Sequence, residues 1–330
     1  MQLYYLPTTD PTLNLACEEL LARNASDSVF MLWRNAPSII IGYNQNTAAE
    51  IDEDFVKAKG IRVVRRMTGG GAVYHDLGNI NYSCIVQERV WNADSAAGFT
   101  APIVAALQAL GVDAAFSGRN DILANGRKIS GCARSVPKGH TLFHGTLLFD
   151  TELDVLASAL KPDPEKIRSK GIKSVRARVG NIRDMLPGGR EAMEMDQFIN
   201  HLKTQVSQYY GGQGMTDIPD ELRRQAEELA EKKYRTWEWN YGTAIQYDVK
   251  KRIHFAGGMI QAEFNVKENR LSEIRFSGDF FGSHTVEELV PQLLGQPPRQ
   301  ELLKGFLETI PLNDYIAGIT AEELSALLSV

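Results

Sequence analysis

Three consecutive glycines stand between two arginines and a strand-like Ala-Val-Tyr in the segment RRMTGGGAVYHD (65–76). Glycine permits unusual backbone angles and close approach, so consecutive N–H groups of such a run can converge on an oxyanion. A neighbouring arginine can add a charge-assisted contact to the same anion. The alternative is a tight turn with two solvated arginines, because glycine-rich turns are common. The segment therefore predicts a loop between strands that is either an anion cradle or a plain turn.

The glycine run does not match the familiar phosphate-binding motifs. A Walker A loop requires G-x-x-x-x-G-K-[ST], and a dinucleotide fingerprint requires G-x-G-x-x-G at the start of a helix. Here the glycines precede Ala72, Val73 and Tyr74, whose side chains favour a strand. The run therefore matches neither motif, although its backbone N–H groups could still converge on an anion.

A second segment, SGRNDILANGRKISGCAR (117–134), supplies a candidate partner for the glycine run. The Asn-Gly pair at 125–126, between two apolar stretches, is a strong signal for a two-residue hairpin turn. It places Lys128 on the returning strand, where a fixed ammonium group suits phosphate and carboxylate oxygens. Asn120 and Asp121 on the outgoing strand carry oxygen atoms of the kind that Mg²⁺ prefers. The competing interpretation of Lys128 is an exposed hairpin lysine without a role.

The apolar patterning predicts two domains of mixed helix and strand. Strand-like and helix-like segments alternate irregularly as far as the polar helix DELRRQAEELAEKKY and the aromatic cluster WEWNYG. Short strands follow (AIQYDV, MIQAEFNV and LSEIRFSG, with KENR as a hairpin loop), and then helices whose starts are marked by the capping-box pairs Thr285/Glu288 and Thr320/Glu323. We predict a large domain over residues 1–243 and a small α+β domain over residues 244–330.

Composition and charge argue against several classes of protein. A net charge of −5 is unusual for a nucleic-acid binder, which is ordinarily basic. The 3 cysteines form no C-x-x-C pair, and His140 with His144, although on one face of a strand, lack the further ligands of a zinc site. The N-terminus has no signal-peptide pattern, and no apolar run reaches about 18 residues. We expect a cytoplasmic protein that binds neither nucleic acid nor a membrane.

Taken together, these segments resemble the lipoate–protein ligase A family. The resemblance rests on RRMTGGGAVYHDLGNINYS, GRNDILANGRKISGCA, HGTLLF, KGIKSVRARVGNI and WEWNYG, which occur in the family's order. It is strongest over residues 33–181 and weakest past Gly242, and the combination of R-R-x-x-G-G-G-A-V-[FY]-H-D with K-[IV]-S-G is highly specific. It implies an α+β fold: a biotin/lipoate ligase-like catalytic domain of mixed β-sheets flanked by helices, followed by a small α+β accessory domain.

The resemblance also implies an activity with two steps. Lipoate is activated with ATP to lipoyl-AMP, pyrophosphate is released, and the lipoyl group then passes to a lysine of a lipoyl domain. The implied acceptors are the lipoyl domains of 2-oxoacid dehydrogenase E2 subunits and the glycine cleavage H protein. The resemblance also implies that Mg²⁺ accompanies ATP and that the acid is lipoate or octanoate. The enzyme is expected to be a monomer. Adenylation brings two anions together, which calls for fixed positive charge and backbone donors rather than a nucleophile.

Residue roles follow from the same resemblance. The implied ATP contacts are Arg66, Gly71, Ala72, Val73, Tyr74 and Lys128. Lys128 is also implied to touch the lipoate carboxylate, and the basic segment 166–179 is implied to cover the adenylate. The apolar lipoyl tail, whose burial contributes roughly 3 kcal/mol for about four methylenes, needs an apolar slot. The candidate wall is Trp33, and His75 and Asn79 are further candidates just past the glycine run.

One alternative remains open within the same fold family. A cysteine-dependent octanoyl or lipoyl transferase forms a thioester and uses no ATP. Cys132, four residues past Lys128, keeps this alternative open, because the ligase pattern usually has another small residue there. A non-enzymatic adenylate-binding protein is disfavoured by the intact glycine run and lysine, and the glycine–arginine loop of a biotin ligase is not found.

Overall fold

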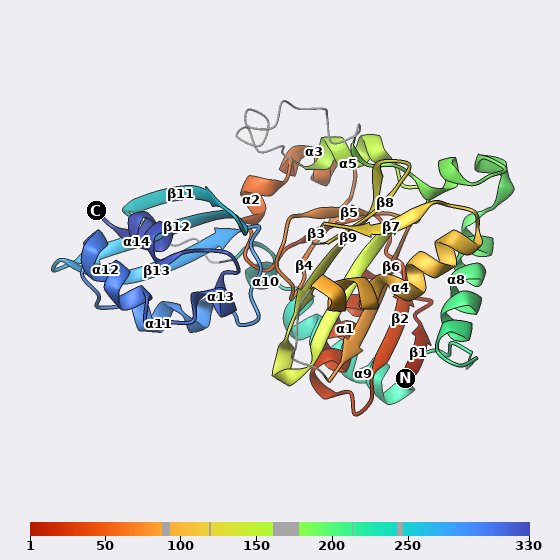
Figure 1. The fold of residues 1–330 in the computed structure, drawn as a ribbon, viewed down its shortest axis with the longest axis horizontal. Coiled ribbons are helices and arrows are strands. Elements are labelled where there is room, and N and C mark those ends of the chain that lie inside the picture. Colours follow the sequence, from red (N-terminus) through yellow and green to blue (C-terminus); the bar gives the residue numbers. More distant parts are fainter. Residues whose placement is uncertain (88–92, 119, 161–177, 213, 243–246) are drawn as a thin grey trace. The chain divides into compact units, whose positions relative to one another are not determined.

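The computed structural model describes residues 1–87, 93–118, 120–160, 178–212, 214–242 and 247–330 (Figure 1). Contacts between Cα atoms divide the chain into two compact units. Unit 1 contains Met1–Ile40, Ala48–Val64 and Val73–Asn240, and unit 2 contains Ile41–Thr47, Arg65–Ala72 and Tyr241–Val330. The glycine run and its two arginines therefore group with the C-terminal part of the chain, although they lie far from it in sequence.

Unit 1 is built on a 7-stranded sheet in the order β1-β2-β6-β10-β9-β8-β7. The pairs are antiparallel except for β1 with β2, which is parallel. The strands are β1 (Gln2–Tyr5), β2 (Val29–Trp33), β6 (Asn79–Val86), β7 (Ala114–Ser117), β8 (Asp121–Ala124), β9 (Arg127–Ser135) and β10 (Thr141–Leu148). Neighbours in this sheet are thus often distant in sequence, so its order depends on long-range pairing.

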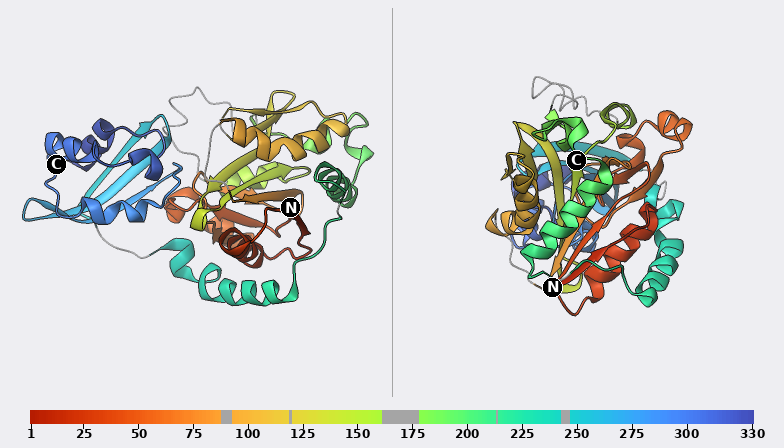
Figure 2. Two further views of the ribbon diagram at one scale, coloured as in Figure 1. Left: turned by 60° about the horizontal axis from the view of Figure 1, so that its bottom comes forward. Right: turned by 90° about the vertical axis from the view of Figure 1, so that its right-hand side faces the viewer.

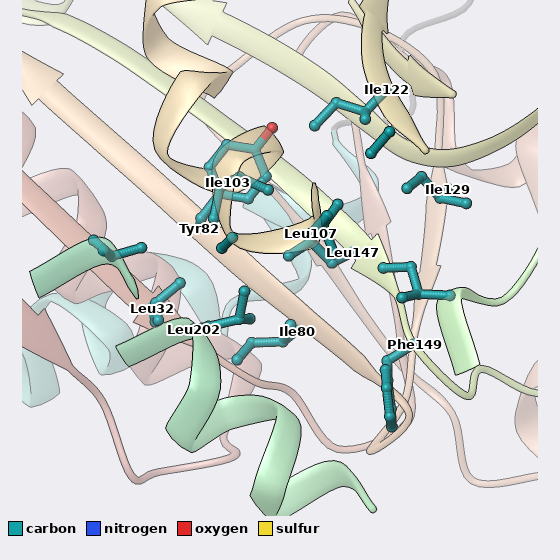
Figure 3. Packing of buried hydrophobic residues seen from close by; sticks show 14 of the residues in the cluster. Leu32, Ile80, Tyr82, Ile103, Leu107, Ile122, Ile129, Leu147, Phe149 and Leu202 are labelled. Carbon is teal, nitrogen blue, oxygen red and sulfur yellow. The ribbon is translucent and has the colours of Figure 1, made fainter. Parts of the chain in front are cut away.

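Helices cover both faces of this sheet. The helices of this part of the chain include α1 (Pro11–Asn24), α4 (Ala93–Ala109), α5 (Leu153–Ala159), α8 (Met195–Tyr209), α9 (Asp220–Leu229) and α10 (Trp237–Tyr241), with a π-helical turn η4 (Ala230–Tyr234) after α9. Of these, α5 contacts β5 of the smaller sheet. Helix α1 lies beside α9 (Figure 2). On the other face, Leu107 of α4 and Leu202 of α8 pack against Ile80, Tyr82 and Leu147 of β6 and β10 (Figure 3). This apolar core uses alternate residues of each strand and leaves the remaining side chains to the α1 side.

A smaller sheet carries the glycine run. It has the order β4-β3-β5, with β4 (Arg62–Arg65), β3 (Ser38–Ile41) and β5 (Val73–His75). The run connects β4 to β5, as the sequence predicts for a loop between strands. Short helices α2 (Thr47–Glu50) and α3 (Glu53–Ala58) lie between β3 and β4 in the chain.

The C-terminal part of unit 2 is a 3-stranded antiparallel sheet with helices, as predicted. Its strands are β11 (Val249–Phe255), β12 (Gly258–Lys267) and β13 (Arg270–Gly278), and its helices α11 (Val290–Leu293), α12 (Gln300–Leu307), α13 (Leu312–Tyr315) and α14 (Ala321–Leu328). The predicted KENR hairpin is confirmed, with the residues at 268 and 269 in the left-handed region. No helix among the described residues is long and apolar enough to cross a membrane.

Two local predictions for this part were wrong. The first strand, expected over 244–249, lies partly outside the described residues, and β11 begins only at Val249. In β11, exposed basic side chains alternate with half-buried ones. Because several of its residues are lysine or arginine, the sequence did not indicate a strand there. Thr320 and Glu323 form the predicted capping box. Thr285 does not cap the next helix, because its hydroxyl bonds the Glu288 carboxylate instead and the turn is a 3₁₀ helix.

Candidate functional site

The β8–β9 hairpin forms as the Asn-Gly pair predicts. Asn125 and Gly126 have φ values of 49° and 72°, the left-handed conformation that a type I′ turn requires at both central positions. The ladder shifts register between Ile122 and Leu123, which is the signature of a β-bulge. The hairpin brings Lys128 opposite Leu123 on a rigid strand.

The Lys128 side chain lies against two neighbours, and its backbone is bonded to a third residue. Its Nζ lies 2.7 Å from Asp121 Oδ1 in a partly exposed ion pair. The side chain lies over Gly131, where an added Cβ would come within 3.0 Å of Lys128 Cε and Nζ. The Lys128 carbonyl accepts a hydrogen bond of 3.0 Å from the Gly180 N–H. A positive charge with such fixed surroundings can serve as a preorganised contact for an anion.

Arg66 is bonded to the glycine run itself. Its Nε donates to Thr68 Oγ1 at 2.9 Å, and its Nη2 donates to the carbonyls of Gly69 at 2.8 Å and Gly71 at 2.9 Å. In a trans peptide the C=O and the following N–H point in opposite directions. The N–H groups that follow these two carbonyls therefore point away from the guanidinium. Arg66 thus fixes the shape of a loop whose N–H groups can face an anion.

Arg65 has a different set of contacts, although the sequence gives the two arginines the same appearance. It is buried, and its guanidinium donates to the carbonyls of Gly42, Tyr43 and Gln45 and to Thr47 Oγ1, at 2.7–2.9 Å. Burial lowers its pKa to about 10. Both arginines are buried, which argues against the alternative of a plain turn with two solvated arginines. Arg65 instead ties the segment 41–47 to the start of the glycine run.

The three glycines differ in what a side chain would meet. A Cβ at Gly69 would lie 2.4 Å from the Phe280 carbonyl oxygen. Gly70 has a left-handed φ of 92°, and a Cβ there would come within 3.1 Å of both the Phe281 ring and Arg66 Nη2. A Cβ at Gly71 would meet nothing within 4 Å in the described part of the chain. The first two glycines are required by packing and conformation, so Gly71 alone presents an open backbone surface.

The rest of the predicted ATP segment continues into β5. Ala72 and Val73 are half-buried, and Tyr74 is buried opposite Ile39 of β3. Burial raises the pKa of Tyr74, so its hydroxyl stays neutral at physiological pH. Contacts of these residues with a nucleotide would therefore be made through their backbone.

A row of side chains crosses the α1 side of the large sheet. Trp33 of β2 lies opposite Asn81 of β6, which lies opposite Thr146 of β10. The Thr146 hydroxyl accepts a hydrogen bond of 3.2 Å from the N–H of Gly131 on β9, beneath the Lys128 side chain. Directly opposed residues on adjacent strands share a face. The sheet thus places the Lys128 ammonium and the Trp33 indole at two ends of one continuous row.

His75 and Asn79, the other candidates for contact with the apolar tail of lipoate, lie beside this row. The Trp33 and His75 rings meet edge to face at 6.2 Å, and His75 Nδ1 lies 3.1 Å from Asn35 Nδ2. Asn79 precedes Asn81 by two positions on β6, and its Nδ2 donates to Asn81 Oδ1 at 3.0 Å. Residues chosen from separate segments of the sequence are therefore neighbours in space.

Three further polar residues were not predicted from the sequence. Ser83 Oγ accepts from Trp33 Nε1 at 2.8 Å and donates to Glu18 Oε1 at 2.5 Å. His144 Nδ1 lies 2.9 Å from the same carboxylate oxygen. The available signal was an acidic residue, Glu18, on the buried stripe of an otherwise apolar helix; charged side chains are rarely fully buried without partners. A zinc site at His144 stays unsupported, since no three potential metal ligands gather within the described ranges.

The candidate magnesium ligands have other partners as well. Asp121 pairs with Lys128, and Asn120 Nδ2 donates to the Cys132 carbonyl at 3.1 Å. One carboxylate and one amide oxygen fit a Mg²⁺ that takes most of its ligands from phosphate and water, the usual arrangement at nucleotide sites. The basic segment 166–179 lies almost entirely outside the described residues. Val179, at the described end of this segment, forms a parallel β-bridge with Lys128.

Cys132 is a buried neutral thiol. It is 4% exposed, and its Sγ lies 2.9 Å from the Tyr82 hydroxyl in the apolar core. Burial raises its pKa to about 11. A nucleophilic cysteine needs a depressed pKa and access to its substrate, and this thiol has neither.

Comparison with known proteins identifies the family. Residues 10–207 match the lipoyl protein ligase A/B catalytic domain, and residues 244–328 match the bacterial lipoate protein ligase C-terminus. The chain is 42% identical to lipoate–protein ligase 1 of Staphylococcus aureus and 37% identical to a lipoate–protein ligase of Bacillus subtilis, in each case over 97% of both chains.

Solved structures agree with this assignment. A lipoate–protein ligase A bound with ATP is 30% identical, with a TM-score of 0.62 over 73% of this chain and 99% of that one. A Thermoplasma acidophilum protein with bound lipoic acid is also 30% identical, with a TM-score of 0.60 over 74% of this chain and 100% of that one. A bipartite lipoate protein ligase from the same organism, described together with its E2 lipoyl domain, is 33% identical, with a TM-score of 0.64 over 76% of this chain and 100% of that one.

Proposed function

Because the chain belongs to the lipoate–protein ligase family, we propose that its two conspicuous segments divide the work of activation: the hairpin holds lipoate, and the glycine run holds ATP. The enzyme activates lipoate with ATP, in the presence of Mg²⁺, to lipoyl-AMP and transfers the lipoyl group to lipoyl-accepting proteins.

The row from Lys128 to Trp33 is the observation that carries the lipoate site. Lipoate has a carboxylate at one end and an apolar tail with a dithiolane ring at the other. The Lys128 ammonium suits the carboxylate, while the Trp33 indole offers an apolar wall at the far end of the row. His75 and Asn79 line the same end. This arrangement supports a site in which Lys128 receives the charged head and Trp33 lies beside the apolar tail.

The glycine run is proposed to receive the nucleotide. Arg66 holds two loop carbonyls, so the N–H groups after them are directed away from it, an arrangement that supports their proposed contact with the phosphates. Gly71 leaves room for close approach, and Ala72, Val73 and Tyr74 continue the backbone contact. Preorganised N–H groups cost no reorganisation when charge develops on the α-phosphate.

Activation joins two anions, and the proposed role of Lys128 follows from that. A lipoate carboxylate oxygen attacks the α-phosphorus, the bond to the β-phosphate oxygen breaks, and pyrophosphate leaves. Lys128 touches both the carboxylate and the α-phosphate, which lowers their repulsion as they approach. Asp121 and Asn120 would hold Mg²⁺, which would supply positive charge to neutralise the phosphates. No covalent enzyme intermediate is needed.

Transfer requires an acceptor lysine that attacks the mixed anhydride and displaces AMP. We propose that the acceptors are the lipoyl domains of 2-oxoacid dehydrogenase E2 subunits and the glycine cleavage H protein, and that the enzyme acts as a cytoplasmic monomer. We keep the proposed division into a catalytic domain at 1–243 and an accessory domain at 244–330. In that division the accessory domain orients the catalytic domain and supplies no reacting group.

Lipoate-dependent exchange of labelled pyrophosphate into ATP tests the proposed function. The enzyme should catalyse exchange only when lipoate or octanoate is present, because pyrophosphate re-enters through the acyl adenylate. Omitting the acid is the control for contaminating ATPases. Absence of exchange with either acid, in an enzyme shown to be folded, would reject the ligase mechanism.

The cysteine-dependent transferase is not favoured, and Cys132→Ser provides a direct check. We expect this variant to keep ATP-dependent lipoylation within about tenfold, a change of ~1.4 kcal/mol or less in the barrier, because the buried thiol takes no part in the chemistry. Intact-mass measurement after incubation with an acyl donor, without ATP, gives a second readout. An acyl–enzyme that forms on the wild type and disappears in Cys132→Ser would show the transferase mechanism instead.

A further inference from the structure

Two asparagines on β6 have polar atoms that no described residue satisfies. Asn79 and Asn81 are both buried, with exposed fractions of 0% and 1%. Asn79 Nδ2 donates to Asn81 Oδ1, and this bond leaves Asn79 Oδ1 and Asn81 Nδ2 without a hydrogen-bond partner among the residues that the structure describes. Rotating both amides exchanges the two roles but still leaves one donor and one acceptor unused. A buried donor or acceptor without a protein partner is usually bonded to a ligand or an ordered water.

The position of the pair indicates which part of a ligand it meets. Asn81 lies between Trp33 and Thr146 in the row, two strands away from the strand of Lys128. Two strand spacings amount to about 10 Å. An extended chain advances about 1.2 Å per bond, so the nearer sulfur of lipoate, six bonds from its carboxyl carbon, lies ~7 Å along the chain. A hydrogen bond of about 3 Å between the carboxylate and the Lys128 ammonium places that sulfur about 10 Å from the ammonium. The pair therefore lies at the level of the dithiolane ring.

We infer that the Asn79–Asn81 pair is a specificity determinant that reads the dithiolane sulfurs of lipoate and disfavours a plain fatty acid such as octanoate. This inference rests on the proposed placement of the lipoate carboxylate at Lys128. A sulfur atom is a weak acceptor that can take the unused amide N–H. Octanoate puts a methylene at the same level and leaves the donor buried and unpaired. A site built to bond a group rejects analogues that lack the group more strongly than an apolar pocket does.

The nearby polar side chains do not compete for this role. The Trp33 indole N–H is donated to Ser83, and Ser83 in turn donates to Glu18. These groups satisfy one another within the sheet face and helix α1. The asparagine pair is thus a place along this row where a hydrogen-bonding atom of the ligand finds a partner that the described residues do not already supply.

Pyrophosphate exchange with each acid, measured on Asn81→Leu and Asn79→Leu, tests the inference. The ratio of kcat/KM for lipoate to kcat/KM for octanoate should exceed one in the wild type and fall about tenfold or more in at least one variant. The ratio is taken on one preparation, so the folded fraction cancels. Asn200→Leu makes the same chemical change at an exposed position of α8 and should leave the ratio unchanged.

The outcomes separate this inference from the proposed function. A wild type without exchange on either acid refutes the proposed function itself. A wild type that exchanges equally well with both acids, or variants that lose both activities in parallel, would show that the pair has only a structural role. If either leucine variant fails to fold, Asn81→Ser and Asn79→Ser, which are smaller and leave room for water, provide the same ratio.

Discussion

Lys128→Ala is expected to fold normally and to lose lipoate activation by a factor of about 10²–10³, the usual effect of removing one preorganised electrostatic contact. Folding should survive because the lysine is a partly exposed hairpin residue, and its partner Asp121 remains about one-third exposed and hydrated (32%). The measurement is lipoate-dependent pyrophosphate exchange, with circular dichroism and a thermal melt on the same preparation.

Two companion variants sharpen this test. Arg127→Ala removes a positive charge from the preceding, exposed position of the same strand, and it should stay close to wild type because successive strand residues face opposite sides. Lys128→Arg should not restore activity, because a planar guanidinium does not reproduce a point contact made by an ammonium group beside Gly131. A folded Lys128→Ala enzyme with near-normal exchange would refute the assignment.

Substitutions in the glycine run should separate nucleotide binding from loop structure. Gly71→Val is expected to lower ATP affinity at least tenfold with little change in Tm, because its Cβ enters the open space proposed for phosphate and its φ is not left-handed. Gly70→Val is expected to lower both the ATP affinity and the Tm, since valine is strained at a φ of 92° and would crowd Phe281. Calorimetric titration with ATP beside a thermal melt distinguishes the two effects.

Gly71→Ala is the matched control, because it adds one methyl group in the same direction and should lose less affinity than valine does. If Gly71→Val lowers the Tm but leaves ATP affinity normal, the run is a plain turn. Equal losses of affinity and stability at Gly71 would lead to the same conclusion.

Local chemistry made part of the site predictable from the sequence. The Asn-Gly pair at 125–126 dictates a tight hairpin whatever the rest of the fold does, and so it places Lys128 and Asp121 on adjacent strands. The loop between β4 and β5 was also predictable from local sequence, because three glycines before a β-prone segment disfavour a helix.

Long-range pairing made the rest unpredictable. The row from Trp33 through Asn81 to Thr146 exists only because strands far apart in the chain pair in one register, and no local pattern specifies that order. Arg65 and Arg66 are equivalent as letters, but one binds the segment 41–47 and the other binds the glycine run. The hydrogen bonds of a buried group such as Glu18 also depend on tertiary structure.

The grouping of the glycine run with the C-terminal residues has a consequence for synthesis of the protein on the ribosome. Domains generally form in the order in which they are made, at roughly 5–20 residues per second. Here the carbonyl of Asn44 accepts a hydrogen bond from the N–H of Gly278, and Gly69 packs against the backbone of Phe280. More than two hundred positions separate the partners in each pair, so at these rates roughly ten seconds or more pass between their translation. A nascent chain therefore carries its arginine–glycine segment unfinished until most of the polypeptide has emerged, and a prematurely terminated product lacks the contacts that shape it.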